Sequence, residues 1–234
     1  MNEARVLVII PAYNEEESLP GILDEAQSVA PGYDLLVVDD GSRDRTAPVC
    51  RERGVPVIRH AVNLGVGGAL QTGFRFALEH GYRIVIQLDA DGQHDPRYRN
   101  ALRDPVWEGA CDVAIGSRYV ARSGYRTPRA RRLGMLLFSG VVWLALRERI
   151  ADTTSGFRAY GHAVMEACRD DFPKDFPDAP LLIGLKRRGF RLLEVPVEMR
   201  ERHRGRSFYT LGRSLYYPYK NLLASLMAWL RRPV

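Results

Sequence analysis

The chain has 234 residues, of which 46% are hydrophobic and 26% are charged, so it can bury a full core and is an ordinary globular protein by composition. Its 34 Lys and Arg against 28 Asp and Glu give a net charge of +6, which favours anionic partners such as nucleotides, phospholipid surfaces or nucleic acid. The three cysteines form no CxxC pair and the N-terminus does not resemble a signal peptide, which argues against a zinc site, a disulfide framework and secretion, and favours a cytoplasmic location.

Short apolar runs alternate with helical patterns through the first half of the chain. The helical patterns predict helices over 15–29, 45–53 and 68–80. This alternation implies right-handed crossovers and therefore an open, twisted, mostly parallel sheet flanked by helices, in the α/β class. The predicted strands are 6–10, 35–39, 55–59, 84–88 and 111–117.

Polar motifs follow the first three predicted strands. PAYNEEE follows the first strand, and the second runs into Asp39, Asp40 and a turn at Gly41. An acidic group at such a strand end can accept hydrogen bonds from a ribose or a nucleobase. The glycines of NLGVGGA (63–69) allow close approach of the backbone to a ligand, but they do not form GxGxxG after the first strand, so a nicotinamide enzyme is not expected.

The most informative segment is IVIQLDADGQHD (84–95), in which an apolar strand leads into Asp89 and Asp91. Carboxylates fixed at a strand end are suited to holding Mg²⁺ or Mn²⁺ against a diphosphate, because these hard cations take oxygen ligands from one or two carboxylates and from phosphate. A solvated acidic turn would give the same short pattern. The prediction of a metal site therefore depends on the neighbouring motifs as well.

Two segments of the second half combine arginines with apolar residues. An apolar stretch over 133–146 lies between arginines, and 215–230 adds tyrosines and a tryptophan before Arg231 and Arg232. The first stretch is too short for a confident transmembrane span, and both suit either the surface of an anionic bilayer or burial against the core or a partner. We therefore predict a domain over 1–210, with a nucleotide-sugar half (1–118) and an acceptor half (119–210) that holds a basic, apolar helical region, followed by an amphipathic C-terminal helix (211–234).

Six motifs in this order and spacing resemble the family 2 glycosyltransferases with the GT-A fold. The match extends over about residues 5 to 207, and the subgroup it resembles most contains dolichyl-phosphate mannosyltransferases and bacterial polyprenyl-phosphate glycosyltransferases. The motifs are PAYNEEE, VVDDGSRDRT, NLGVGGA, LDADGQHDP, GSRY (116–119) and DTTSGFRAY (152–160).

The resemblance implies a site with four sets of residues. The nucleotide-binding set is Pro11, Ala12, Tyr13, Glu15, Asp39, Asp40, Gly65 and Asp89. The metal set, for Mn²⁺ or Mg²⁺, is Asp89, Asp91 and Gln93. The catalytic set is Asp91, Asp152 and Arg118. The acceptor-binding set is Arg131, Ser155, Arg158, Arg202 and Ser207, where Arg202, Gly205 and Ser207 match an RxxGxS element whose usual following Lys is Phe208 here.

These residues imply an inverting transfer of mannose or glucose from GDP-mannose or UDP-glucose to a polyprenyl phosphate, at the cytoplasmic face of a membrane or beside a small membrane-protein partner. A phosphate monoester has its second pKa near 6, so its nucleophilic oxygen is already ionised at neutral pH and needs no strong base. Two alternatives remain open. In one, the acceptor is a saccharide or small-molecule hydroxyl and Asp152 is the general base; in the other, the chain is a non-catalytic module that binds a nucleotide sugar or nucleic acid.

Overall fold

The computed structural model describes residues 5–29, 32–120, 150–173 and 178–200, together with 224, 225 and 227. The strands in these ranges are β1 (Val6–Ala12), β2 (Asp34–Asp39), β3 (Val57–Arg59), β4 (Ile84–Gln87), β5 (Val113–Ser117), β6 (Arg158–Gly161) and β7 (Leu192–Pro196). The helices are α1 (Leu19–Val29), α2 (Thr46–Glu52), α3 (Val66–Glu79), the 3₁₀ turn η1 (Pro96–Tyr98), α4 (Arg99–Trp107), α6 (His162–Cys168) and α7 (Ala179–Arg187).

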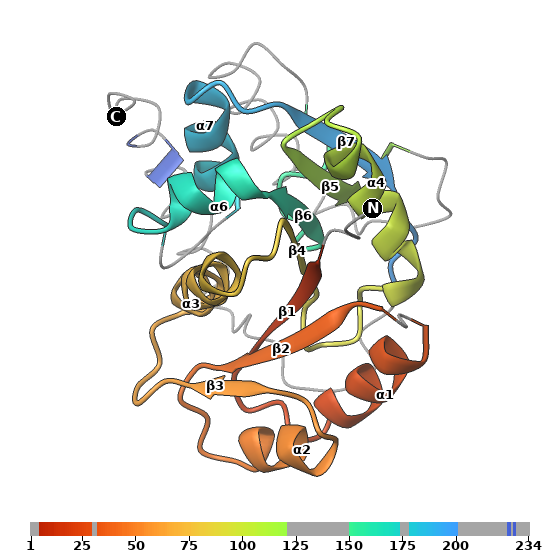
Figure 1. Cartoon of the computed structure of the whole chain (residues 1–234), viewed down its shortest axis with the longest axis vertical. Helices are drawn as coiled ribbons and strands as arrows, with labels where there is room; N and C mark the ends of the chain where they lie inside the picture. The colour runs from red at the N-terminus through yellow and green to blue at the C-terminus, as the bar shows by residue number, and fades with distance from the viewer. Residues whose placement is uncertain are drawn as a thin grey trace, which may run out of the picture.

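The strands form one sheet in the order β3-β2-β1-β4-β6-β5-β7 (Figure 1). β1 pairs in parallel with β2 on one side and with β4 on the other. Strands β2 and β3 therefore lie on one side of β1, and the next strand in the chain, β4, lies on its other side. This reversal of strand order makes a topological switch point beside β1. Open α/β sheets bind their ligands at such points, outside the carboxyl ends of the strands.

β6 is the one described strand that opposes the others, because it pairs antiparallel with both β4 and β5. Its start therefore lies at the edge of the sheet where β4 and β5 end. This arrangement brings the DTTSGF segment, which directly precedes β6, next to the acidic segment that follows β4.

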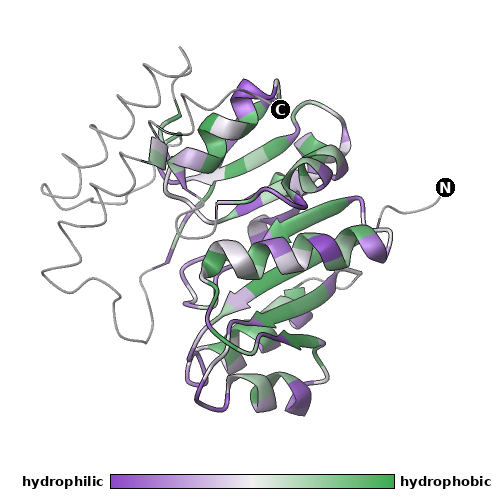
Figure 2. Cartoon of the chain, turned by 90° about the vertical axis from the view of Figure 1, so that its left-hand side faces the viewer, coloured by the Kyte–Doolittle hydropathy of each residue, from purple (hydrophilic) through white to green (hydrophobic). Residues whose placement is uncertain are grey.

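Two apolar cores cover the two faces of the sheet. Leu7 and Ile9 of β1 belong to the core shared with α3, α6 and α7, whereas Val8 and Ile10 belong to the core shared with α1, α2 and α4. This alternation is the period of two expected of a strand buried on both faces. Figure 2 shows the result, with largely hydrophobic strands between helices of mixed hydropathy.

The expected α/β fold is confirmed, and the predicted strands and helices match the described elements to within a few residues. One difference is that α1 begins at Leu19 and not at residue 15. The residues before it bind a neighbouring loop instead, since the Glu15 N–H donates to Thr46 Oγ1 at 2.9 Å and the Glu16 N–H donates to Asp44 Oδ2 at 3.1 Å.

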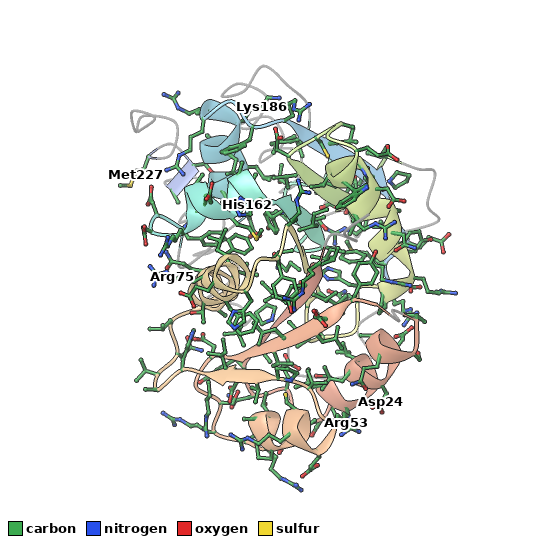
Figure 3. All side chains as sticks on the ribbon, viewed as in Figure 1. Asp24, Arg53, Arg75, His162, Lys186 and Met227 are labelled. Atoms are coloured by element: carbon green, nitrogen blue, oxygen red, sulfur yellow. The ribbon has the colours of Figure 1, made fainter. Side chains whose placement is uncertain are left out.

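Side-chain pairs tie the outer helices to each other and to the loops. Asp24 of α1 and Arg53 at the end of α2 form an ion pair of 2.8 Å, and Arg75 of α3 reaches Asp170 after α6 at 3.2 Å (Figure 3). No helix in the described ranges is long and apolar enough to cross a membrane. Most of the predicted basic region and C-terminal helix lies outside the described residues, although 224, 225 and 227 are helical.

Candidate functional site

The predicted motifs gather at one edge of the sheet because of strand direction. β1, β2, β4 and β5 end there, and β6 begins there. The segments that follow or precede these strands therefore share the edge, although up to about 140 residues separate them in the chain. They are 13–18, 40–45, 88–95, 118–120 and 152–157.

The loops after β1 and β2 are joined by hydrogen bonds. Asn14 has a positive φ of 55°, a conformation that Asn tolerates better than most residues. Its N–H donates to Ser42 Oγ at 2.9 Å, and its side-chain Oδ1 accepts from the Arg43 N–H at 2.9 Å. The PAYN and DDGSR motifs are therefore joined directly to each other.

Asp39 is fully buried at the end of β2. Its Oδ1 accepts the Ser42 N–H at 2.9 Å, and Arg59 Nε lies 3.2 Å from Oδ2. Despite that short distance, the Arg59 N–H is not aligned on Oδ2, and no described donor makes a hydrogen bond to this oxygen. Arg59 is half exposed and covers the carboxylate, so a ligand that reaches Asp39 must share or replace this contact.

Asp40 has a different environment from Asp39. Its carboxylate accepts the N–H groups of Leu64 and Gly65, both at 2.8 Å, and pairs with His60 Nδ1 at 2.8 Å. These contacts occupy both oxygens. Asp40 therefore fixes the loop before α3, and with it Gly65, whose φ of 85° is in the region that favours glycine.

Asp89, Asp91 and Gln93 follow β4, beside the switch point. All three are partly exposed, and 35% of the Asp89 side chain faces solvent. Asp91 Oδ1 accepts the Gln93 N–H at 3.0 Å, which fixes the tight turn between them. The three side chains that the sequence predicts to be metal ligands thus lie on one short turn.

Gly156 is a neighbour of Asp89 that the sequence analysis did not select. A Cβ on Gly156 would lie 2.6 Å and 2.9 Å from the two carboxylate oxygens of Asp89, so only glycine allows this approach. Gln87 and His94, which also contact Asp89, were missed too. A polar residue within the buried strand IVIQ was the available signal for Gln87, whereas pairing across the sheet with β6 could not be read from the sequence.

Arg118 and Asp152 bind each other. The guanidinium makes two hydrogen bonds to the carboxylate, from Nε and Nη2, both at 2.7 Å, and the Arg118 N–H adds a third at 3.1 Å. The side chains are 7% and 0% exposed, respectively. Glu194 in turn accepts the Asp152 N–H at 2.8 Å. Two of the three predicted catalytic residues are thus engaged in a buried ion pair, and neither of these two projects into solvent.

Ser155 and Arg158, which were predicted to contact the acceptor, are also buried. Ser155 Oγ accepts the Phe157 N–H at 3.3 Å, and Arg158 Nη2 donates to the Thr153 carbonyl at 3.1 Å. Both side chains thus lie within the fold of the DTTSGFR segment. The remaining predicted acceptor residues, Arg131, Arg202 and Ser207, lie outside the described residues.

The oxygen donors at the end of β4 fit a hard divalent cation that is shared with a ligand. In the described part of the chain, no three His, Cys, Asp or Glu side chains converge to enclose a metal. Mg²⁺ is usually held by one or two carboxylates plus substrate phosphates and water, and such a site needs no enclosing cage. The partly exposed pair Asp89 and Asp91 meets this requirement, with Gln93 as a third oxygen donor.

The sequence is similar to proteins of known activity over most of its length. The chain is 38% identical over 212 residues to the polyprenol monophosphomannose synthase of Mycolicibacterium smegmatis, a match covering 86% of this chain and 79% of that protein. It is 35% identical over 214 residues to the undecaprenyl-phosphate mannosyltransferase of Micrococcus luteus, covering 87% and 86%.

Among solved structures, the glucosyl-3-phosphoglycerate synthase of Mycobacterium tuberculosis, in complex with Mn²⁺ and UDP-glucose, superposes with a TM-score of 0.72 at 22% identity, covering 99% of this chain and 81% of that one. That likeness supports the GT-A fold. The model of the glycosyl transferase family 2 matches residues 7–168, which include every described motif at the sheet edge. The chain therefore belongs to glycosyl transferase family 2 and is a glycosyltransferase.

Proposed function

We propose that this glycosyltransferase transfers mannose or glucose from a nucleoside diphosphate sugar to a polyprenyl phosphate, with inversion at the anomeric carbon and with a bound Mn²⁺ or Mg²⁺. The observation that carries the proposal is the pair Asp89 and Asp91 at the switch point of the sheet. The names of the M. smegmatis and M. luteus relatives support the lipid phosphate as acceptor.

The donor nucleotide would bind between the joined loops after β1 and β2. Pro11, Ala12, Tyr13 and Glu15 would line one side of it, and Asp39 would accept a ring N–H of the base. Asp39 Oδ2 has no hydrogen bond from the described residues, so it has an accepting position to offer once Arg59 moves aside. Asp40 and Gly65 would contribute to nucleotide binding indirectly, by fixing the position of the loop before α3.

The diphosphate would lie over the turn after β4. Asp89, Asp91 and Gln93 would hold the cation, which stabilises negative charge on the departing nucleoside diphosphate. Asp91 and Gln93 are joined by the Gln93 N–H hydrogen bond, so their oxygens would act as one preformed unit. Preformed ligands reduce the reorganisation that the reaction requires.

The contacts of Asp152 support a phosphate acceptor over a hydroxyl acceptor. A general base needs an oxygen within reach of the hydroxyl proton, but Asp152 is 1% exposed and its oxygens accept hydrogen bonds from Arg118 and Thr154. An ionised phosphate oxygen attacks without such a base. We therefore assign Asp152 to holding Arg118 in place beside the site, and we propose that Arg131 and Arg202 attract the lipid phosphate.

The metal assignment predicts the behaviour of Asp91→Asn. The amide keeps the size of the side chain but removes its charge, so turnover should fall by about a hundredfold or more, because charge stabilisation at a leaving group contributes several kcal/mol. The measurement is glucosyl or mannosyl transfer to a short polyprenyl phosphate, with and without EDTA, alongside the melting temperature. Asp24→Asn, on the distant outer surface of α1, is the matched control. Full activity in Asp91→Asn or under chelation would refute the metal role.

The acceptor assignment predicts a difference between a polyprenyl phosphate and the corresponding polyprenol. With each nucleotide sugar in turn, mass analysis of the lipid should detect sugar on the phosphate and none on the alcohol.

Asp152→Asn should lower the free energy of unfolding by about 3–5 kcal/mol, because it leaves the Arg118 charge buried and unpaired. Transfer to the alcohol or to a saccharide by wild type, together with a folded but inactive Asp152→Asn, would favour the general-base alternative.

A further inference from the structure

His94 lies beneath Asp89 and contacts it twice. The ring is 6% exposed and stacks on Phe157, with centroids 4.9 Å apart and planes at 12°. The Asp89 backbone N–H donates to His94 Nδ1 at 3.1 Å, and His94 Nε2 lies 3.6 Å from Asp89 Oδ2. One imidazole therefore contacts both the main chain and the carboxylate of the same residue.

The backbone contact fixes the tautomer of the ring. A nitrogen that accepts an N–H carries no proton, so the proton of neutral His94 is on Nε2. This protonated nitrogen is the one that lies 3.6 Å from Asp89 Oδ2, which is beyond hydrogen-bond distance but close enough for the positive end of the N–H dipole to attract the carboxylate. Metal-binding carboxylates in proteins are commonly oriented by polar groups that do not themselves bind the metal.

A second donor holds the other oxygen of Asp89. Gln87 Nε2 donates to Asp89 Oδ1 at 3.1 Å, and the Tyr160 hydroxyl donates to Gln87 Oε1 at 3.3 Å, which fixes the orientation of the amide. Burial raises the pKa of Tyr160 above its ordinary value, so its hydroxyl keeps the proton that it donates. Asp89 Oδ1 therefore accepts a hydrogen bond, and Oδ2 has the N–H of His94 Nε2 as its neighbour at 3.6 Å.

We propose that His94 is a positioning residue for the nucleotide–metal site, acting through its Nε2 proton to hold the Asp89 carboxylate in the orientation that binds the cation. This inference rests on the proposed function, because it concerns the same site. It adds a role for a buried side chain that does not itself bind the metal. In this role the two ring nitrogens have different functions: Nδ1 accepts the Asp89 N–H, and Nε2 attracts the Asp89 carboxylate.

Two substitutions test the two nitrogens separately. In His94→Asn, the side-chain amide oxygen can take the place of Nδ1 and accept the Asp89 N–H, but nothing reaches Oδ2. In His94→Gln, the amide group reaches the position of Nε2 and can donate to the carboxylate, but the backbone acceptor is lost. The control is His162→Asn at the start of α6 (Figure 3), where the histidine is about half exposed. It follows Gly161, which pairs with Ile84 at the end of β4 opposite the turn.

The measurement is Mn²⁺ affinity in the presence of GDP or UDP, by titration calorimetry, with the melting temperature and the KM for acceptor measured in parallel. His94→Asn should keep a melting temperature near that of wild type but lose about tenfold to a hundredfold in Mn²⁺ affinity, as is typical for loss of an outer-shell partner. His94→Gln should retain most of the affinity with a lower melting temperature. The KM for acceptor should not change in either variant.

Equal Mn²⁺ affinity in wild type and folded His94→Asn would overturn the inference while leaving the proposed function intact. Wild-type protein that binds no Mn²⁺ with either nucleotide would overturn both. If His94→Asn does not fold, Phe157→Leu replaces it, because it removes the surface on which the ring stacks, so that Nε2 is no longer held opposite Asp89 Oδ2. Unchanged Mn²⁺ affinity in Phe157→Leu, in the same titration, would then refute the positioning role.

Discussion

At the residue scale, the site depends on close contacts that tolerate no added atom. Gly156 shows this most clearly, because the two oxygens of Asp89 and the amide nitrogen of Gln87 all lie within 2.9 Å of where its Cβ would be. The backbone of Gly156 is not among those with a positive φ, so an alanine there is opposed by the contact and not by the backbone. Glycine at this position therefore preserves the geometry of Asp89.

Gly156→Ala should displace the Asp89 carboxylate and weaken Mn²⁺ binding with nucleotide by about tenfold or more, since outer-shell changes typically have effects of that size. The comparison is calorimetric titration of Gly156→Ala, of wild type and of Gly21→Ala, where an added Cβ on α1 meets nothing within 4 Å. An unaltered affinity in Gly156→Ala would mean that Asp89 accommodates the methyl group and that its observed position is not required.

At the element scale, the sheet edge is shaped by how closely α3 packs on β1. Gly73 of α3 faces Ile9 of β1, and a Cβ there would lie 2.5 Å from Ile9 Cδ1 and 2.9 Å from Cγ2. Because the Asp40-bound loop leads directly into α3, the position of this helix also sets the position of Gly65 at the site.

Gly73→Ala should destabilise the protein by about 1–3 kcal/mol, because overpacking outweighs the roughly 1 kcal/mol gained from the better helix propensity of alanine. Ile9→Val removes Cδ1 and should restore part of the loss in the double variant. Urea unfolding of the two single variants and the double variant measures this coupling. Gly184→Ala in α7, with open space at its Cβ, should be neutral or stabilising. Additive effects of Gly73→Ala and Ile9→Val would contradict the contact.

At the scale of the whole molecule, carboxylates paired with arginines join distant parts of the chain. Hydrogen bonds from Arg191 lower the pKa of Asp112, and they join the start of β5 to the start of β7. Burial opposes ionisation of Asp95, but hydrogen bonds from Arg97 and the charge of Arg200 outweigh it, so the pKa of Asp95 is also lowered. Arg200 also makes two hydrogen bonds of 2.7 Å to Glu25 of α1.

These two lowered pKa values predict a loss of stability in acid. A carboxyl group with a lower pKa in the folded state stabilises that state above its unfolded pKa of about 4, and the stabilisation disappears as the pH falls through the folded value. Urea midpoints should therefore decrease below about pH 4. Asp112→Asn should be less stable at neutral pH and should lose less on acidification. Asp170→Asn, whose side chain is 83% exposed, is the control. Identical pH profiles for Asp112→Asn and wild type would contradict this account.

The sequence by itself determined the class of the fold and the edge of the sheet at which the predicted donor-side residues lie. Alternating apolar runs and helical patterns identify a parallel sheet, and a motif at a strand end is placed at the ligand edge by strand direction alone. Asp89 and Asp91 could be selected as candidates for this reason, since each lies within a few residues of a clear strand, and the family resemblance added Gln93.

Only the tertiary structure decided what each of these residues contacts. The structure shows that Asp152 and Arg118 are buried together, that Asp40 holds a loop, and that Asp39 keeps an oxygen without a hydrogen bond from the described residues. The approach of Gly156 to Asp89 depends on the antiparallel insertion of β6 between β4 and β5. The local sequence pattern indicates whether a segment is a helix or a strand and where it ends, but the order of the strands in the sheet is set by the packing of the whole core. For this reason, a contact between segments far apart in the chain, such as that of Gly156 with Asp89, cannot be read from the sequence of one chain.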